Sequence, residues 1–425
     1  MIIKAFKLVH WGQPGQYVEI PKPKPGPNDV LIRMRAAGLC RSDLDMMDSQ
    51  PGSAPYASSV DPDYVLGHEN SGYVAELGRN VTDLRVGEAV VVHHMPHCGN
   101  CAACTGGFEN YCQAFKRGAI ATGRGCGGDG GLAEFLVAPR AELISLGFDV
   151  DPADYAPLTD AAVTAYHAVR TAVQRLKPGT SAALIGIGGL GMYGVQFVKL
   201  LSAAQIYAVD TNEDRLQVAR EVGADATVLF QEGSEEKEAA AGDEIMRLTR
   251  GRGVDVIVDF VGSGPTLQLA ARISRPQGRI VLMGMHPGEQ SALAVGWGRL
   301  ATGCEFAISL GSTRQDLREV CALAMQGKLR IDVQRFGFDE IPRAYAELRA
   351  GHLTGRAVVV FPKPETTTTN DGTPILSEGW LDTVQTVIDQ KACVGIEHFQ
   401  EGWKVTPERY ELPLFGAGHW AKWVE

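Results

Sequence analysis

The sequence predicts an α/β fold with two domains and a C-terminal extension, and three observations support this. The first part of the chain is a series of short β-branched runs separated by Gly, Pro and Asn turns. From about residue 156, short apolar runs alternate with segments of helix length, which is typical of a doubly wound parallel sheet. A glycine-rich turn lies between the first such run and the first such helix. We therefore expect a β-rich domain followed by a parallel-sheet domain.

Length and composition limit the class of protein. The 425 residues include 40 Lys+Arg and 50 Asp+Glu, and 45% are hydrophobic. These values are ordinary for a folded protein of two or three domains. An acidic chain without a dense basic cluster is a poor nucleic-acid binder. No apolar run approaches the roughly 18 residues that span a bilayer, and the N-terminus has no long apolar core. We predict no nucleic-acid or membrane partner and a cytoplasmic location.

The predicted elements follow this division. In residues 1–155 the expected strands are Asp29–Met34, Tyr73–Leu77, Glu88–His93 and Glu134–Ala138. In residues 156–312 they are Ala182–Ile187, Gln205–Val209, Ala226–Phe230, Val254–Val261, Arg279–Met283 and Phe306–Leu310. Residues 313–362 begin with a helical stretch to about Gln326 and return to strand texture at Ile331–Phe336 and Arg356–Phe361.

The glycine-rich turn is Gly186-x-Gly188-x-x-Gly191, and the next strand ends at Asp210. Gly186 permits the tight turn, Gly188 allows close approach to a pyrophosphate, and Gly191 lets the helix pack on the strand. The helix N-terminus offers free N–H groups to phosphates. Asp210 can accept hydrogen bonds from the ribose hydroxyls and would repel a 2′-phosphate. The pattern predicts a Rossmann domain that binds NAD, against the alternative of a Gly-rich turn in an unrelated α/β domain.

Four of the nine cysteines are concentrated in one short segment, Cys98-x-x-Cys101-x-x-Cys104-x7-Cys112. This spacing can surround one tetrahedral zinc ion. Because four thiolates leave no open coordination position, we expect this zinc to be structural. The alternative is a set of ordinary buried or disulfide-bonded cysteines, which the paired CxxC steps disfavour.

The chain resembles the zinc-containing alcohol dehydrogenases of the medium-chain dehydrogenase/reductase superfamily. In the order of that family it carries GLCRSD at 38–43, GHE at 67–69, the four cysteines, LTDAAVTAYHA at 158–168 and the glycine-rich turn. The resemblance covers residues 1 to about 362. It implies a GroES-like catalytic domain in 1–155, to which 313–362 returns, and a Rossmann domain in 156–312.

The resemblance also implies a catalytic zinc with an open fourth position. Cys40 and His68 match two of its ligands, and Asp160 stands where many relatives have Cys and a subset, including secondary-alcohol dehydrogenases, has Asp. Taken alone, Asp160 could instead cap the helix that follows it. Glu69 matches a carboxylate that can approach the metal when substrate is absent. Ser42 matches the hydroxyl that takes the proton of the substrate alcohol.

Further positions match cofactor contacts of the family. Arg41 and Arg356 match contacts to the pyrophosphate, Arg215 a contact near the adenosine ribose, and Thr164 a contact near the nicotinamide. The rest of the proton route departs from the family. Many relatives have His at the position of Asp45, which is here either the next proton acceptor or a solvated surface acid.

His94 is a second departure, because many relatives place an aromatic residue beside the substrate at this position. His94 could hydrogen-bond a polar substrate or act as an alternative base. The alternative is that it belongs to a partly solvated group of histidines at a strand end, with His93 and His97.

Together these features predict an NAD-dependent, zinc-containing alcohol dehydrogenase. We expect reversible hydride transfer between an alcohol, best a secondary one, and NAD, with two zinc ions per chain. As in relatives of this kind, the chain is expected to form a homo-oligomer, either a dimer or a tetramer. The alternatives are a polyol or amino-alcohol dehydrogenase of the same superfamily, or a non-catalytic NAD-binding scaffold with one structural zinc.

Residues 363–425 resemble no family. They open with KPETTTTNDG, which is typical of a linker, and contain four of the six tryptophans. A segment so rich in aromatic area is expected to pack on a surface or subunit interface, or else to reach a neighbouring active site or a partner.

Overall fold

The computed structural model describes residues 1–53, 57, 60–115, 123–231, 233–284, 300–353 and 355–363, and the backbone of 366–368 and 374–376. All of these belong to one compact unit, Met1–Leu376. The predictions for the tryptophan-rich tail lie outside the described residues. Among the described helices, none is both long and apolar enough to cross a membrane.

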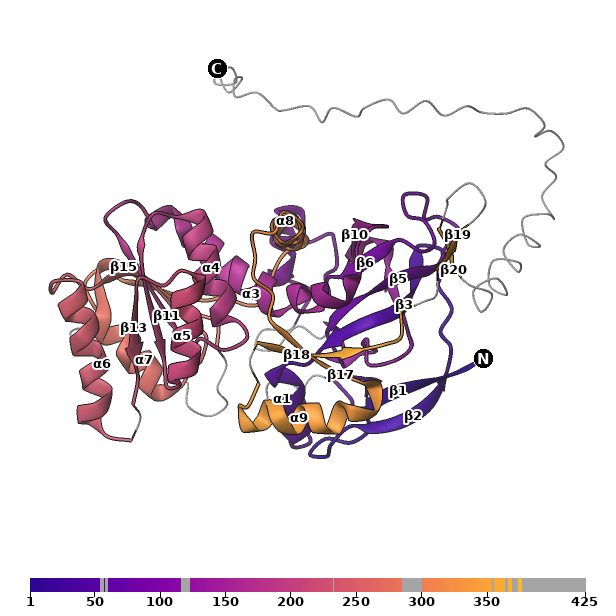
Figure 1. Ribbon diagram of the computed structural model, residues 1–425, viewed down its shortest axis with the longest axis horizontal. Coiled ribbons are helices and arrows are strands. Elements are labelled where there is room, and N and C mark those ends of the chain that lie inside the picture. The colour runs from indigo at the N-terminus through magenta and orange to yellow at the C-terminus, as the bar shows by residue number, and fades with distance from the viewer. Residues whose placement is uncertain are drawn as a thin grey trace, which may run out of the picture. The chain divides into compact units, whose positions relative to one another are not determined.

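A seven-stranded sheet forms the centre of the β-rich domain (Figure 1). Its order is β10 (Leu143–Gly147), β6 (Ala89–Val92), β5 (Glu69–Leu77), β3 (Asp29–Gly38), β18 (Arg356–Val360) and β17 (Val333–Phe336), with β9 (Phe135–Pro139) also paired to β3. Strand β18 pairs antiparallel with β3, so the chain returns to this sheet after the second domain. Smaller sheets join β2 (Gln16–Pro21), β1 (Ile2–Leu8) and β4 (Tyr64–Val65), and β7 (Gly123–Arg124) with β8 (Gly127–Gly128).

The hydrophobic core of this domain contains buried side chains from the sheet strands, from β1 and from two helices. In β1 the sequence IIKAFKL buries Ile3 and Ala5 on one face and Phe6 and Leu8 on the other, so the strand is covered on both faces toward its end. These side chains join a cluster that includes residues from β18, from α1 (Arg41–Asp48) and from α9 (Ile341–Ala350). The cluster therefore holds together segments from both ends of the described chain.

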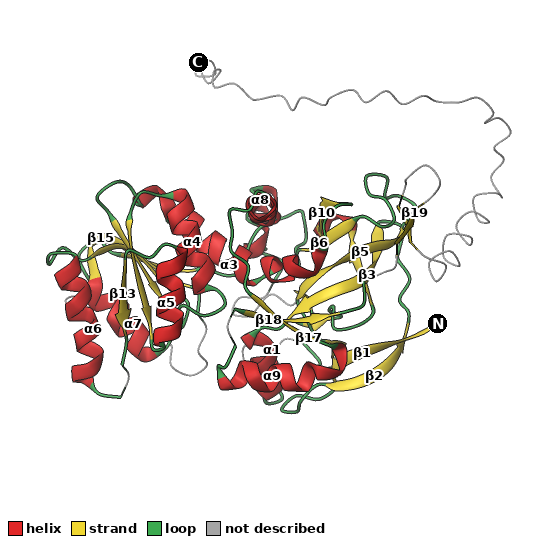
Figure 2. Ribbon diagram, viewed as in Figure 1, coloured by secondary structure: helices red, strands yellow, loops and turns green. Residues whose placement is uncertain are grey.

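The second domain is a six-stranded parallel sheet with helices on both faces (Figure 2). The strand order is β13 (Ala226–Leu229), β12 (Gln205–Asp210), β11 (Ser181–Ile185), β14 (Val254–Asp259), β15 (Ser274–Leu282) and β16 (Glu305–Ile308). The helices are α4 (Gly191–Leu201), α5 (Glu213–Val222), α6 (Glu235–Leu248) and α7 (Gly264–Ile273). Numbered along the chain, the strands follow the order 3-2-1-4-5-6, which is that of the dinucleotide-binding fold. The predicted fold class is confirmed.

Helices α3 (Ala161–Arg170) and α8 (Arg314–Met325) lie outside the two sheets, and α3 directly follows the site residue Asp160. The 3₁₀ segment η3 (Pro152–Thr159) leads through Asp160 into α3, and every residue of α3 except the last is buried. Helix α8 begins with a capping box in which the Thr313 hydroxyl and the Asp316 carboxylate bind each other's backbone N–H groups. The lobe with the four cysteines contains α2 (Ala102–Thr105) and η1 (Glu109–Tyr111).

One expected linker has regular structure. Strand β19 (Thr366–Thr368) pairs antiparallel with β20 (Pro374–Leu376), so the linker prediction for the threonine run is wrong. Threonine is β-branched and favours strands, and the sequence Asn370-Asp371-Gly372 is typical of a turn. The same residues therefore suit a hairpin as well as a linker.

Candidate active site and metal centres

Cys40, His68 and Asp160 come together although they are far apart in sequence. Cys40 follows β3 and His68 precedes β5, and these neighbouring strands pair Gly38 with Glu69, so the two donors start from adjacent positions. The Oδ2 atom of Asp160 lies 3.4 Å from the Cys40 Sγ and 3.5 Å from the His68 Nε2. With a carboxylate oxygen of Glu69, all four donor atoms lie within 4.8 Å of one another.

This donor set fits a zinc ion. Bond lengths of about 2.0–2.3 Å to S, N and O in a tetrahedron place neighbouring donors about 3.3–3.8 Å apart. The two measured separations fall in that range. Burial alone would raise the pKa of Asp160, but His68, His94 and Arg356 together hold it well below its usual range. Asp160 is the N-terminal flanking residue of α3, yet its side chain makes no capping hydrogen bond, so the helix-cap alternative does not describe it.

Asp43 is a functional residue that the sequence analysis missed. Its carboxylate is completely buried, with Oδ1 3.0 Å from the Nδ1 of His68 and Oδ2 accepting a hydrogen bond from the Cys40 backbone N–H. Such a partner fixes the ring so that Nε2 faces the metal position. The signal was an acid three residues after a ligand cysteine, within GLCRSD, at the start of a helix.

Arg356 links the donor set to the glycine-rich turn. Its Nε donates to both carboxylate oxygens of Glu69 at 2.9 and 3.2 Å, and its Nη2 lies 3.4 Å from Oδ2 of Asp160. A Cβ added to Gly189 would lie 2.6 Å from Nη1 of the same side chain. Burial raises the pKa of Glu69, and the charge of Arg356 opposes that shift. One buried guanidinium therefore contacts both the carboxylates and the turn expected to hold the pyrophosphate.

Of the remaining predicted site residues near Cys40, some lie at the donor set and others lie at the surface. Ser42 Oγ lies 3.6 Å from Cys40 Sγ, and Thr164 Oγ1 donates to Oδ1 of Asp160 at 3.2 Å. Asp45 lies one turn after Ser42 on α1, with its side chain 22% exposed and 3.7 Å from Nε of Arg41. Arg41 is 68% exposed, so the structure brings Ser42 and Thr164 to the donor set and leaves Arg41 at the surface.

His94 and His93 are buried, which contradicts the partly solvated alternative. His94 is 8% exposed, its Nδ1 lies 3.0 Å from the Thr159 carbonyl oxygen, and its Nε2 lies 3.9 Å from Oδ1 of Asp160. His93 points elsewhere, with Nε2 3.0 Å from the Ser312 carbonyl oxygen, and burial lowers its pKa to about 3. These two residues directly follow β6, which packs against η3, and the His94 ring contacts Thr159 of that segment.

The glycine-rich turn has the expected geometry. Gly186 has φ +86°, and a Cβ added to Gly191 would lie 1.9 Å from the Gly186 carbonyl oxygen, whereas Gly188 faces open space. The Asp210 carboxylate accepts hydrogen bonds from the backbone N–H groups of Ile187 at 2.6 Å and Asn212 at 2.9 Å. Because a carboxylate has about four acceptor positions, room remains for ribose hydroxyls.

Arg215 lies beside this acid. Its Nη1 is 3.8 Å from Oδ1 of Asp210, and its Nη2 is 3.5 Å from the carbonyl oxygen of Gly351. The side chain therefore borders the position where the adenosine ribose is expected.

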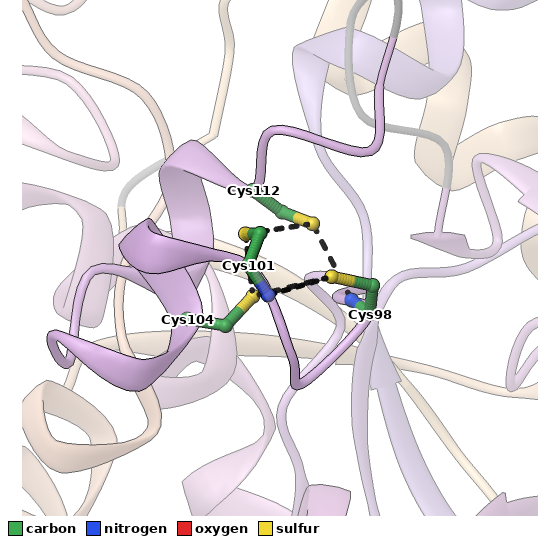
Figure 3. A group of neighbouring side chains, drawn as sticks. All are labelled: Cys98, Cys101, Cys104 and Cys112. Atoms are coloured by element: carbon green, nitrogen blue, oxygen red, sulfur yellow. Dashed lines mark hydrogen bonds between the residues drawn. The ribbon is translucent and has the colours of Figure 1, made fainter.

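The four cysteines form a closed cluster (Figure 3). Their sulfur atoms point toward one another, with separations of 3.4 Å for Cys101–Cys104 and 3.9 Å for both Cys98–Cys104 and Cys101–Cys112. Zn–S bonds near 2.3 Å place tetrahedral sulfurs about 3.8 Å apart, so the cluster fits zinc. Backbone N–H donors, from Cys104 first and then from Gln113, lower the pKa of Cys101 to about 6 and favour its thiolate. No disulfide joins the cysteines in the described part of the chain.

Comparison with known proteins agrees with this geometry. Residues 26–147 match the family described as alcohol dehydrogenase GroES-like domain, and residues 189–326 match the family described as zinc-binding dehydrogenase. An NAD-dependent alcohol dehydrogenase from Sulfurisphaera tokodaii is 31% identical over 364 residues, which is 84% of this chain and all of the relative.

Solved structures of alcohol dehydrogenases and related reductases share the fold of this chain. The alcohol dehydrogenase of Aeropyrum pernix is 32% identical, with a TM-score of 0.73 over 84% of this chain and all of that one. The acetophenone reductase of Geotrichum candidum, solved with NAD, is 27% identical, with a TM-score of 0.68 over 85% of this chain and 97% of that one. With the shared domains, the order of the motifs and the convergent donors, the chain belongs to the zinc-containing alcohol dehydrogenases of the medium-chain dehydrogenase/reductase superfamily.

Proposed function

We propose that this chain transfers hydride reversibly between an alcohol and NAD at a zinc ion held by Cys40, His68 and Asp160. The observation that carries the proposal is the convergence of three different donor atoms beside a buried arginine that also touches the glycine-rich turn. This arrangement links the metal position to the expected cofactor position through one side chain. Relatives named as NAD-dependent alcohol dehydrogenases support it.

The residues proposed to bind NAD border the turn or the donor set, except Arg41, which follows Cys40 in the chain and lies at the surface. They are Gly186, Gly188, Gly191, Asp210, Arg215, Arg41, Thr164 and Arg356. When bound, zinc supplies a Lewis acid that favours the alkoxide, and NAD supplies the hydride acceptor. The protein's own part is to orient both groups and to keep the donor residues dry, since all but Asp160 are buried.

The proton route is proposed to begin at Ser42. Its hydroxyl lies next to Cys40 Sγ, where it can accept the proton of an alcohol held at the open metal position. Asp45, one helical turn further along α1, is partly exposed and can pass the proton to solvent. Glu69, which is paired with Arg356, would be a fourth possible ligand if zinc were bound without substrate.

His94 is proposed to contact the substrate. Its Nδ1 donates to the Thr159 carbonyl, which leaves the Nε2 lone pair directed to the same region as Oδ1 of Asp160. A substrate with a second hydroxyl or amino group can donate to that lone pair. A His94→Ala variant should therefore lose more kcat/KM for a vicinal diol than for the matching simple alcohol, and equal kinetics across small alcohols would contradict this role.

A secondary alcohol or its ketone is the proposed substrate, with a polyol or amino alcohol as the second candidate because of His94. We also propose a second, structural zinc in the four-cysteine cluster, a homo-oligomeric state and a cytoplasmic location. The non-catalytic scaffold differs from this proposal in needing only the structural zinc.

The decisive experiment counts zinc per chain and follows NAD reduction, in the wild type and in Asp160→Ala, with a panel of primary and secondary alcohols. The proposal expects two zinc ions falling to about one, with loss of activity. One zinc in both proteins, with NAD bound but never reduced, would favour the scaffold.

A further inference from the structure

His167 connects the four-cysteine lobe to the body of the protein. It lies on α3, two turns after Asp160, and is completely buried. Its Nδ1 is 2.8 Å from Oδ2 of Asp316, and its Nε2 is 3.1 Å from both the Asn110 Nδ2 and the Tyr111 hydroxyl. Asn110 and Tyr111 form the η1 turn between the third and fourth cysteines of the lobe. The ring therefore bridges the lobe and the start of α8.

The direction of each hydrogen bond is fixed by the partners. The Asp316 carboxylate accepts, so the proton of the imidazole lies on Nδ1 and the lone pair on Nε2. The Asn110 amide donates to that lone pair and also donates to the Leu310 carbonyl oxygen at 2.8 Å, so both of its N–H bonds are used. The interaction depends on the orientation of one buried amide from the lobe.

The Nδ1 side of the His167 ring binds Asp316, which is itself fixed by several contacts. Asp316 Oδ2 also accepts from the Thr313 backbone N–H and hydroxyl at 2.8 and 2.7 Å, and its Oδ1 lies 2.6 Å from the Arg170 Nε on α3. A second contact runs directly from the lobe, because Glu109 accepts hydrogen bonds from the backbone and side chain of Arg314. The lobe thus contacts both α3 and the first turn of α8, which His167 and Arg170 also join directly through Asp316.

Helix α3 connects His167 to the donor set, because Thr164 on the same helix binds Asp160. Thr164, three residues before His167, donates its backbone N–H to the Asp160 carbonyl oxygen at 2.8 Å and its hydroxyl to Oδ1 at 3.2 Å. Residues three apart lie on the same face of a helix. A shift of α3 at His167 would therefore move the residue that orients Asp160.

We propose that His167 is a positioning residue that couples metal binding in the four-cysteine lobe to metal affinity at Cys40, His68 and Asp160. With zinc in the lobe, η1 presents Asn110 to His167, α3 is fixed, and the Asp160 carboxylate is held toward its co-ligands. Loss of the lobe metal, or of the Asn110 contact, loosens α3 and weakens the distant site. This inference rests on the proposed function, since it requires a metal at both sites.

The test uses Asn110→Ala in a Tyr111→Phe background, because both side chains lie 3.1 Å from His167 Nε2, and together these changes remove the contacts of the lobe to His167 while leaving every cysteine in place. Metal affinity of each site is measured by competition with a chromogenic chelator, and Co²⁺ in place of zinc reports each site separately, because its spectrum depends on the number of thiolate ligands. We expect zinc at the Cys40 site to bind about tenfold more weakly, as for other residues that orient metal ligands, with the lobe metal retained. Gln113→Ala, an exposed change in the same lobe, should match the wild type.

A double-mutant cycle shows whether the Asn110–His167 contact couples the lobe metal to the metal affinity of the Cys40 site. Cys104→Ser, which removes the lobe metal, should weaken the Cys40 site, and adding Asn110→Ala in the same Tyr111→Phe background should weaken it no further. Additive effects, or an Asn110→Ala variant in that background with wild-type affinity at the Cys40 site, would overturn the inference. A wild type that binds no metal at the Cys40 site would instead overturn the proposed function.

Discussion

The four-cysteine lobe takes its sulfur atoms from within fifteen consecutive residues, whereas the Cys40 and Asp160 donors are 120 residues apart. The lobe is closed, partly exposed and made of one ligand type, while the second cluster mixes S, N and O donors and is mostly buried. A short loop closes at low entropic cost and can surround its metal almost alone. Distant donors need a finished sheet to bring them together. The first cluster is therefore a local fold element, and the second is a product of the whole domain.

Metal removal gives the largest expected difference between the two clusters. A short treatment of the zinc-loaded protein with a chelator should remove one zinc per chain and lower alcohol oxidation by about a thousandfold, because an open site loses its Lewis acid first. Zinc content and NAD reduction are measured on the same samples, and added zinc should restore both. Simultaneous loss of both metals would show that the clusters do not differ in this way.

Loss of a cysteine ligand from the lobe should lower the melting temperature more than a substitution of an exposed residue in the same lobe. Cys104→Ser leaves three sulfur ligands, and we expect the melting temperature to fall by about 10 °C, because binding of a structural zinc contributes directly to folding. Differential scanning calorimetry measures the change, with Gln113→Ala, an exposed position in the same lobe, as the control. A melting temperature within about 2 °C of the wild type would mean that the lobe folds without its metal.

Asp43 provides the next test, since it orients a ligand without being one. Asp43→Asn should weaken zinc binding at the Cys40 site about 10–100-fold, because the carboxylate that fixes the His68 ring is lost. Asp48→Asn, at the exposed end of the same helix, should leave the affinity unchanged. Equal affinity in all three proteins would show that the sheet alone sets the position of His68.

The comparison also explains what could be predicted from the sequence. The cysteine spacing and the glycine-rich turn are local patterns, and the two-domain fold followed from strand–helix alternation. The pairing of Glu69 with Arg356 joins residues 287 positions apart, and the burial of His94 depends on the packing of η3 on β6. Neither leaves a local trace in the sequence. Asp43 lies inside the sequence GLCRSD, but its role depends on the orientation of the His68 ring.

The smallest expected effect concerns His93, which directly follows β6 and binds the Ser312 carbonyl oxygen on the segment that leads into α8. Burial lowers its pKa to about 3, so the folded protein keeps it neutral while the unfolded chain binds a proton below about 6.5. Stability should therefore be complete above pH 6.5 and fall as the pH drops toward 3, by at most about 1.4 kcal/mol per pH unit from this residue.

His93→Gln keeps an N–H donor for Ser312 without the titration, so its free energy of unfolding, measured by urea denaturation between pH 4 and 7, should fall less steeply than that of the wild type. His10→Gln, at an exposed position, serves as the matched control. If His93→Gln and the wild type lose stability in parallel, the acid sensitivity belongs to other groups.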